Sequence, residues 1–129
     1  MSDKVRYDYA VIRVVPKVDR AEFINAGVIV SCPDLSFLEA RISLDESRLL
    51  ALDPKVDLDV VRKHLASIPT ICRGGDDAGS IGQLPQRQRF HWLVAPRSTV
   101  IQTSPVHTGR CGDPAVALEH LVATMVDAS

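Results

Sequence analysis

The chain has 129 residues, of which 46% are hydrophobic and 24% are charged, and its formal net charge at neutral pH is −1. This length fits one domain with its own core, so we expect residues 1–129 to form a single globular domain. The composition excludes a disordered or fibrous chain. The longest uncharged apolar run, residues 26–33, is far shorter than the ~20 residues of a membrane span.

The cysteines and the first residues of the sequence both indicate the cytoplasm. The three cysteines, Cys32, Cys72 and Cys111, are odd in number and widely spaced, unlike the disulfide frameworks of small secreted domains. The first ten residues carry both signs of charge and lack the apolar segment of a secretory signal. We therefore expect a cytoplasmic protein with reduced thiols and no membrane contact.

Three strands are predicted in the first third of the chain. Residues 6–15 are apolar on both faces near their end, as in the central strand of a sheet. Residues 26–32 are rich in β-branched side chains and predict a second strand. The turn at residues 33–36 permits a hairpin into residues 37–43, where apolar and charged side chains alternate.

Helical periodicity follows these strands. A short helix is predicted at residues 46–52, and a longer one at residues 57–68 buries a stripe of apolar side chains and stops at Pro69. That stripe contains Leu58, Val61, Leu65 and Ile68. Residues 72–85 hold four of the seven glycines, which predicts a mobile surface loop.

The last third of the chain is predicted to hold two helices and one strand. Residues 86–95 fit either a helix or a strand, and Pro85 favours the helix. Residues 99–104 predict a strand and residues 104–112 a loop. Asp113 and Pro114 are typical of a helix start. This order of elements predicts an α+β fold, a small and mostly antiparallel sheet with helices packed on one face.

The near-neutral net charge conceals an uneven distribution. Residues 78–112 contain none of the sixteen acidic residues and four of the fifteen basic ones, which leaves eleven basic and sixteen acidic residues elsewhere. The basic residues of this segment are all arginines, which bind carboxylates and phosphates in a planar fork and stack on aromatic rings. They are Arg87, Arg89, Arg97 and Arg110, accompanied by His91 and His107.

Two interpretations of this acid-free segment remain open. In one, it forms a surface that binds an anionic small molecule or a partner protein. In the other, its arginines pair with acids of residues 1–77 and stabilise the fold, and such structural ion pairs are the commoner case in proteins. The acids considered for this role are Glu22, Glu39, Asp45 and Glu46. Nucleic acid is disfavoured as a partner, because no known binding motif is present.

A small enzyme acting on a phosphorylated or acyl substrate is the alternative function. In that case His107 would be the general base, and Cys111 or Ser104 the nucleophile. Cys111 lies beside Arg110 and just before a predicted helix start, and both features lower a thiol pKa. The cysteines and histidines lack the paired spacing of a zinc site, and we expect no metal and no other cofactor.

Two blocks of the sequence resemble a known family. The blocks are YDYAVIRVVP at 7–16 with EFINAGVIV at 22–30, and RFHWLVAPRSTVIQTSPVHTG at 89–109. They are similar to the bacterial domain-of-unknown-function family numbered 3037. The resemblance implies a small cytoplasmic bacterial protein of uncharacterised activity, and an accessory partner of HipA-like kinases.

The leading hypothesis is a non-enzymatic α+β binding module. Its recognition surface is predicted to lie within the acid-free segment, and its ligand to be a partner protein or a small anion. The sequence does not specify an oligomeric state. The residues predicted to form this surface are Arg89, Trp92, Arg97, Ser98, Ser104, His107 and Arg110.

Overall fold

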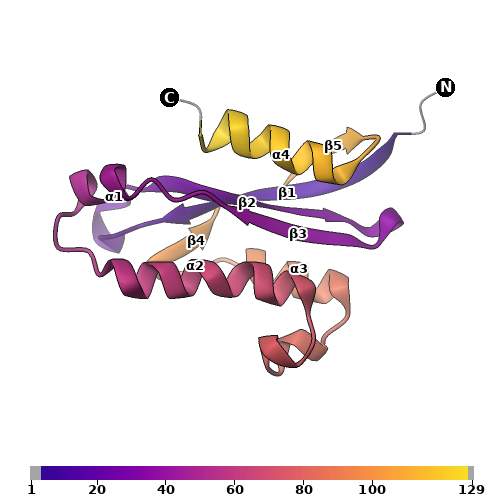
Figure 1. The fold of residues 1–129 in the computed structure, drawn as a ribbon, viewed down its shortest axis with the longest axis horizontal. Coiled ribbons are helices and arrows are strands. Elements are labelled where there is room, and N and C mark those ends of the chain that lie inside the picture. Colours follow the sequence, from indigo (N-terminus) through magenta and orange to yellow (C-terminus); the bar gives the residue numbers. More distant parts are fainter. Residues whose placement is uncertain (1–3, 128–129) are drawn as a thin grey trace.

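A five-stranded antiparallel sheet runs through the middle of the computed structural model, which describes residues 4–127 (Figure 1). The strand order is β3-β2-β1-β4, and β5 pairs with β1 on the same side as β4. The predicted α+β fold is confirmed. The strands are β1 (Val5–Val14), β2 (Ile24–Cys32), β3 (Phe37–Ile42), β4 (Ile101–Thr103) and β5 (His107–Cys111).

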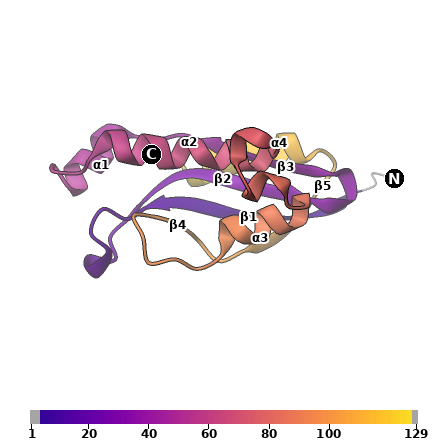
Figure 2. The same ribbon diagram turned by 90° about the horizontal axis from the view of Figure 1, so that it is seen from below.

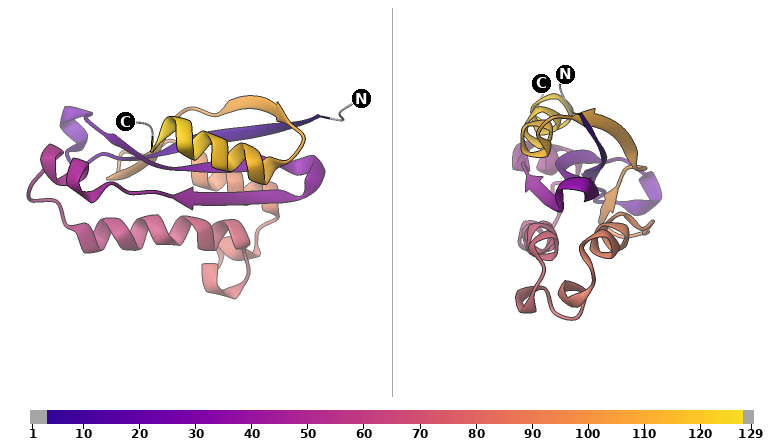
Figure 3. Two further views of the ribbon diagram at one scale, coloured as in Figure 1. Left: turned by 45° about the horizontal axis from the view of Figure 1, so that its top comes forward. Right: turned by 90° about the vertical axis from the view of Figure 1, so that its right-hand side faces the viewer.

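The helices cover both faces of this sheet, and the prediction that they would cover one face is wrong. Helices α2 and α3 lie on one face, and α4 lies on the other (Figures 1 and 3). Viewed from below, α2 lies along β2 and β3, while α3 lies nearer β4 (Figure 2). The helices are α1 (Glu46–Leu52), α2 (Leu58–Arg73), α3 (Gln86–Val94) and α4 (Pro114–Met125).

The second strand explains why two helical layers are needed. Ile29 packs into the core beneath α2, whereas Val28 and Val30 pack against α4 on the opposite face. All three side chains are fully buried. Because successive side chains of a strand point to opposite faces, an apolar run such as this requires cover on both sides.

The long helix α2 continues through Pro69, where a stop was predicted, and ends at Arg73. Proline cannot donate the helical hydrogen bond at its position, which weakens the helix there. After Pro69, the side chains of Ile71 and Cys72 are nevertheless buried in the core. Burial of this last turn compensates for the missing bond.

Residues 72–85 are predicted to form a surface loop, but Cys72 and Arg73 belong to α2, and the rest contains two short 3-10 helices, Asp76–Ala78 and Ile81–Gln83. Hydrogen bonds connect distant residues of this segment. The amide of Gly75 donates to the carbonyl of Gly82 over 3.1 Å, and Gln83 Nε2 donates to Asp76 Oδ1 over 3.0 Å. The helix predicted at residues 86–95 is confirmed as α3. The predicted start of α4 is also confirmed, since Asp113 accepts the Ala115 amide over 2.9 Å.

The edge of the sheet departs from the prediction at residues 107–111, which form β5 rather than a loop. Strands β4 and β5 lie end to end along β1, with Ser104 between them. Within residues 4–127, no helix has the length and apolar character needed to cross a membrane.

Candidate functional site

Arg89, predicted to contact a ligand, instead caps the C-terminal end of α2. Its guanidinium donates three hydrogen bonds to backbone carbonyls, those of Ile71 (3.0 Å), Cys72 (3.2 Å) and Leu84 (2.6 Å). A cation at this end of a helix also opposes the partial negative charge of the helix dipole. Arg89 therefore has a structural role, because it joins α3 to the end of α2.

Arg87 also serves the fold. Its guanidinium donates to the Asp8 carboxylate over 2.5 Å and to the Ser31 hydroxyl over 2.7 Å. An ion pair that stabilises the fold is what the second interpretation of the acid-free segment predicts. The acid is Asp8, which was not among the four acids considered. Two acids that had been considered as partners, Glu22 and Glu46, pair with neighbouring arginines of their own part of the chain.

Arg97 and Trp92 form a stacked pair at the end of α3. The Arg97 guanidinium lies 4.4 Å from the centre of the Trp92 ring. It also donates to the carbonyls of Trp92 (2.5 Å) and Leu93 (3.0 Å), which lie in the last turn of α3. A guanidinium has five N–H donors, so three of those on Arg97 remain for other partners. Trp92 is 40% exposed, a high value for so large an apolar side chain.

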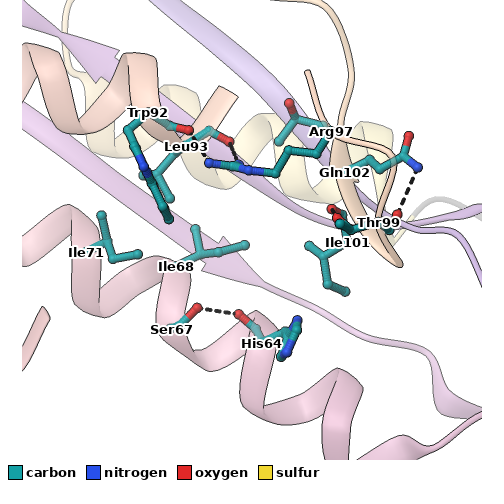
Figure 4. A pocket seen from close by; sticks show the side chains of 11 residues that line it. His64, Ser67, Ile68, Ile71, Trp92, Leu93, Arg97, Thr99, Ile101 and Gln102 are labelled. Atoms are coloured by element: carbon teal, nitrogen blue, oxygen red, sulfur yellow. Dashed lines mark hydrogen bonds between the residues drawn. The ribbon is translucent and has the colours of Figure 1, made fainter. Parts of the chain in front are cut away.

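The stacked pair forms one side of an apolar groove of about 320 Å³ between α2, α3 and β4. The Trp92 indole points from α3 toward Ile68 and Ile71 of α2 (Figure 4). Ile101 of β4 lines the groove, and His64 lies at its rim. Sequence reasoning missed His64, because its place at the groove depends on the packing of α2 against α3 and β4.

A second hollow, of about 350 Å³, adjoins the groove and is lined by two arginines, Arg13 and Arg97. Ser98 and Gln102 also line it, and no carboxylate of residues 4–127 does. Arg97 and Gln102 line both the hollow and the groove. We call this hollow the arginine pocket.

Arg13 is the residue of this pocket that sequence reasoning missed. Its guanidinium lies 4.2 Å from the centre of the Phe23 ring, and its Nε atom is buried without a hydrogen-bond partner among the described residues. Unpaired buried donors are rare and costly, so Arg13 is the candidate ligand-binding side chain of this pocket. The sequence did carry a signal, because Arg13 lies between Val11 and Val15 on an otherwise apolar strand face.

The comparisons with known proteins bear on the family of this chain. A family model described as "Protein of unknown function (DUF3037)" matches residues 9–126. The chain belongs to the DUF3037 family. The resemblance inferred from the two sequence blocks is thereby confirmed. No curated protein and no solved structure matches the chain.

Ser104, another predicted site residue, has a structural role in this DUF3037 protein. It is buried, and its hydroxyl accepts the Val11 amide over 2.9 Å and donates to the Pro105 carbonyl over 2.9 Å. The Ser104 amide in turn donates to the Val11 carbonyl over 2.8 Å. Ser104 thus links the segment between β4 and β5 to the middle of β1 by hydrogen bonds.

His107 and Arg110 lie on β5, away from both the groove and the arginine pocket of the DUF3037 fold. His107 is exposed and packs against Tyr9, with 5.4 Å between the ring centres. Arg110 is exposed and lies opposite Arg6 of β1. The seven predicted site residues therefore separate, and only Trp92, Arg97 and Ser98 come together.

The geometry of β5 also separates His107 from Cys111, one of the two nucleophiles considered for the enzyme alternative. His107 and Cys111 are four residues apart on one strand, about 13 Å at 3.3 Å per residue, which is beyond hydrogen-bond reach. Cys111 is buried, and burial together with Cys32 and Asp113 raises the pKa of its thiol. The prediction that neighbouring features lower this pKa is wrong, because burial outweighs them.

Proposed function

We propose that this DUF3037 protein is a non-enzymatic binding module that recognises an anionic group in the arginine pocket. The observation that carries the proposal is the buried, unpartnered Nε of Arg13 in a hollow that it shares with Arg97. An anion there would accept from Arg13 and from the free donors of Arg97. Both arginines already have fixed positions, Arg13 against Phe23 and Arg97 against Trp92, so little side-chain freedom is lost on binding.

The proposal is tested by NMR titration of the ¹⁵N-labelled protein with inorganic phosphate and, separately, with acetate, at constant ionic strength set by chloride. We expect the Arg13 Nε–H signal and the backbone amides of Ser98 and Gln102 to shift and saturate. In Arg13→Gln the amide shifts should disappear, whereas in Arg48→Gln, which removes an exposed arginine of α1, they should remain. Shifts that do not saturate with either anion, or that persist in Arg13→Gln, would overturn the proposal.

The family resemblance also implies a macromolecular partner, a HipA-like kinase. If the arginine pocket takes part in that interaction, Arg13→Gln and Arg97→Gln should each weaken capture of such a kinase from the same organism. Arg110→Gln removes an exposed arginine on β5, outside the pocket, and serves as the matched control. Equal capture by all three variants would exclude the arginine pocket from the kinase interface.

A further inference from the structure

The groove beside the arginine pocket has room for only a small ligand or for one large side chain of a bigger partner. Its volume of about 320 Å³ is at the lower end of the ~300–1,000 Å³ typical of small-molecule sites. Its floor is apolar, with Ile68, Leu93 and Ile101 among the lining residues. These properties suit one large apolar side chain of a bigger partner, with the rest of that partner lying outside.

The residues at the rim are those that dominate protein interfaces. Tryptophan and arginine are enriched among the residues that contribute most to protein–protein binding. Here the 40% exposed Trp92 is held in place by its stack with Arg97, so it is a rigid contact surface. A partner side chain laid in the groove would cover this exposed ring.

The charge of the groove and the arginine pocket indicates which group of the partner lies next to its apolar side chain. Neither hollow is lined by a carboxylate of the described residues. The charge of Arg97 is partly offset by the two carbonyls at the end of α3, which leaves Arg13 as the main uncompensated cation. A single carboxylate balances this charge better than a phosphate group, which carries nearly two negative charges at neutral pH.

The backbone of β4 offers a contact for a peptide chain. Ladder bonds join Val15 to Val100 and Ser104 to Val11, and bonded pairs alternate along an antiparallel ladder. The backbone N–H and C=O of Thr103 therefore point away from β1. Thr103 also lines the groove, so a peptide in the groove has main-chain groups beside it.

From these observations we infer that the groove and the arginine pocket together bind a protein segment in which a carboxylate lies within about two residues of a large apolar side chain. Arg97 and Gln102 line both hollows, so the two recognised groups must be neighbours in the partner. This inference rests on the proposed function, because the carboxylate would occupy the arginine pocket.

The test uses Trp92, the only tryptophan of the chain, as a fluorescence reporter of the groove. The full chain is titrated with three short peptides that differ at an apolar position and at an acidic position. The first peptide carries leucine and glutamate at these positions, the second carries glycine and glutamate, and the third carries leucine and glutamine. We expect the first to shift the Trp92 emission to the blue and to bind at least tenfold more tightly than the other two. The second should move the Arg13 Nε–H signal and leave the Trp92 emission unchanged.

A pair of variants locates the binding. Ser67 is exposed at the groove, and Ser47 is exposed on α1. Ser67→Phe should fill the groove and weaken the leucine-glutamate peptide about tenfold, while Ser47→Phe should leave it unchanged. Equal affinity for the two glutamate peptides, tighter binding of a phosphoserine analogue, or equal binding of a short fatty acid would overturn this inference. Loss of every shift at Arg13 Nε–H would instead overturn the proposed function.

Discussion

The guanidinium of Arg87, in the first turn of α3, forms an ion pair with the buried carboxylate of Asp8 in β1. Asp8 also accepts a hydrogen bond from the Thr108 hydroxyl over 2.8 Å, so a single carboxylate joins α3, β1 and β5. Its side chain is only 6% exposed. The Arg87 side chain is 38% exposed, so removing the carboxylate leaves a partly solvated guanidinium and destabilises the fold less than breaking a fully buried ion pair would.

Asp8→Asn should lower the free energy of unfolding at neutral pH by about 1–3 kcal/mol. Burial alone would raise the pKa of Asp8, but the hydrogen bonds from Arg87 and Thr108 outweigh it and hold the pKa below its ordinary value of 3.8. A lowered pKa stabilises the folded state above pH 3.8, and this stabilisation is lost as the pH falls through the pKa of the folded state. Urea unfolding at a series of pH values measures both effects.

The matched control is Asp77→Asn, at an exposed aspartate of the loop between α2 and α3. It should change the unfolding free energy by less than about 0.5 kcal/mol. Below about pH 4 the stability of Asp8→Asn should depend less on pH than that of the unaltered protein. If the unfolding free energies of Asp8→Asn and of the unaltered protein changed in parallel with pH, the assigned role of Asp8 would be contradicted.

Arg89→Met should destabilise the protein by about 2–3 kcal/mol, because three partly buried carbonyls lose a charged donor. Arg48→Met removes an arginine from the exposed side of α1 and should be nearly neutral. The midpoints of urea unfolding compare the two variants directly. If both variants unfold alike, Arg89 does not cap α2 as described.

Gly27→Ala should destabilise the sheet by about 1–3 kcal/mol through overpacking. A Cβ at this position would lie 2.5 Å from the Arg41 carbonyl oxygen of the neighbouring strand. Gly112→Ala tests the same substitution where no atom lies within 4 Å, and it should be neutral or slightly stabilising. Thermal unfolding of the two variants gives the comparison, and a Tm for Gly27→Ala equal to that of Gly112→Ala would exclude close packing at Gly27.

The cysteines of the folded protein should alkylate slowly. Burial raises the pKa of the Cys72 thiol to about 12 and also raises that of Cys111. Because the thiolate is the reactive form, iodoacetamide at pH 8 should label both residues much faster in urea than in buffer, as measured by mass spectrometry. Rapid labelling of Cys111 in the folded protein would contradict its burial and its raised pKa.

The parts of the fold that depend on local signals could be predicted from the sequence. Asp113 and Pro114 start a helix because a side chain caps the amides that follow it, and no distant residue is needed. The strand at residues 107–111 could not be predicted in this way. Its sequence, HTGRC, has little β-branched or apolar character, and it is extended because its backbone pairs with β1, about a hundred residues earlier in the chain.

The candidate site was only partly predictable, for the same reason. The acid-free segment led to Trp92, Arg97 and Ser98, which do lie together. It could not show that Arg89 turns its guanidinium to the end of α2, or that Arg13 comes beside Arg97. Arg13 joins the pocket through cross-strand pairing with Gln102, a contact between the first and last thirds of the chain.

The placement of α4 over Val28 and Val30 has a consequence for synthesis on the ribosome. The hairpin of β1 and β2 emerges early, but β4, β5 and α4 all lie after residue 100. At ~5–20 residues per second, several seconds separate the two events. Until then one face of a β-branched strand stays uncovered, and such segments self-associate readily. A nascent chain stalled before α4 should therefore recruit chaperones, whereas the released protein should not.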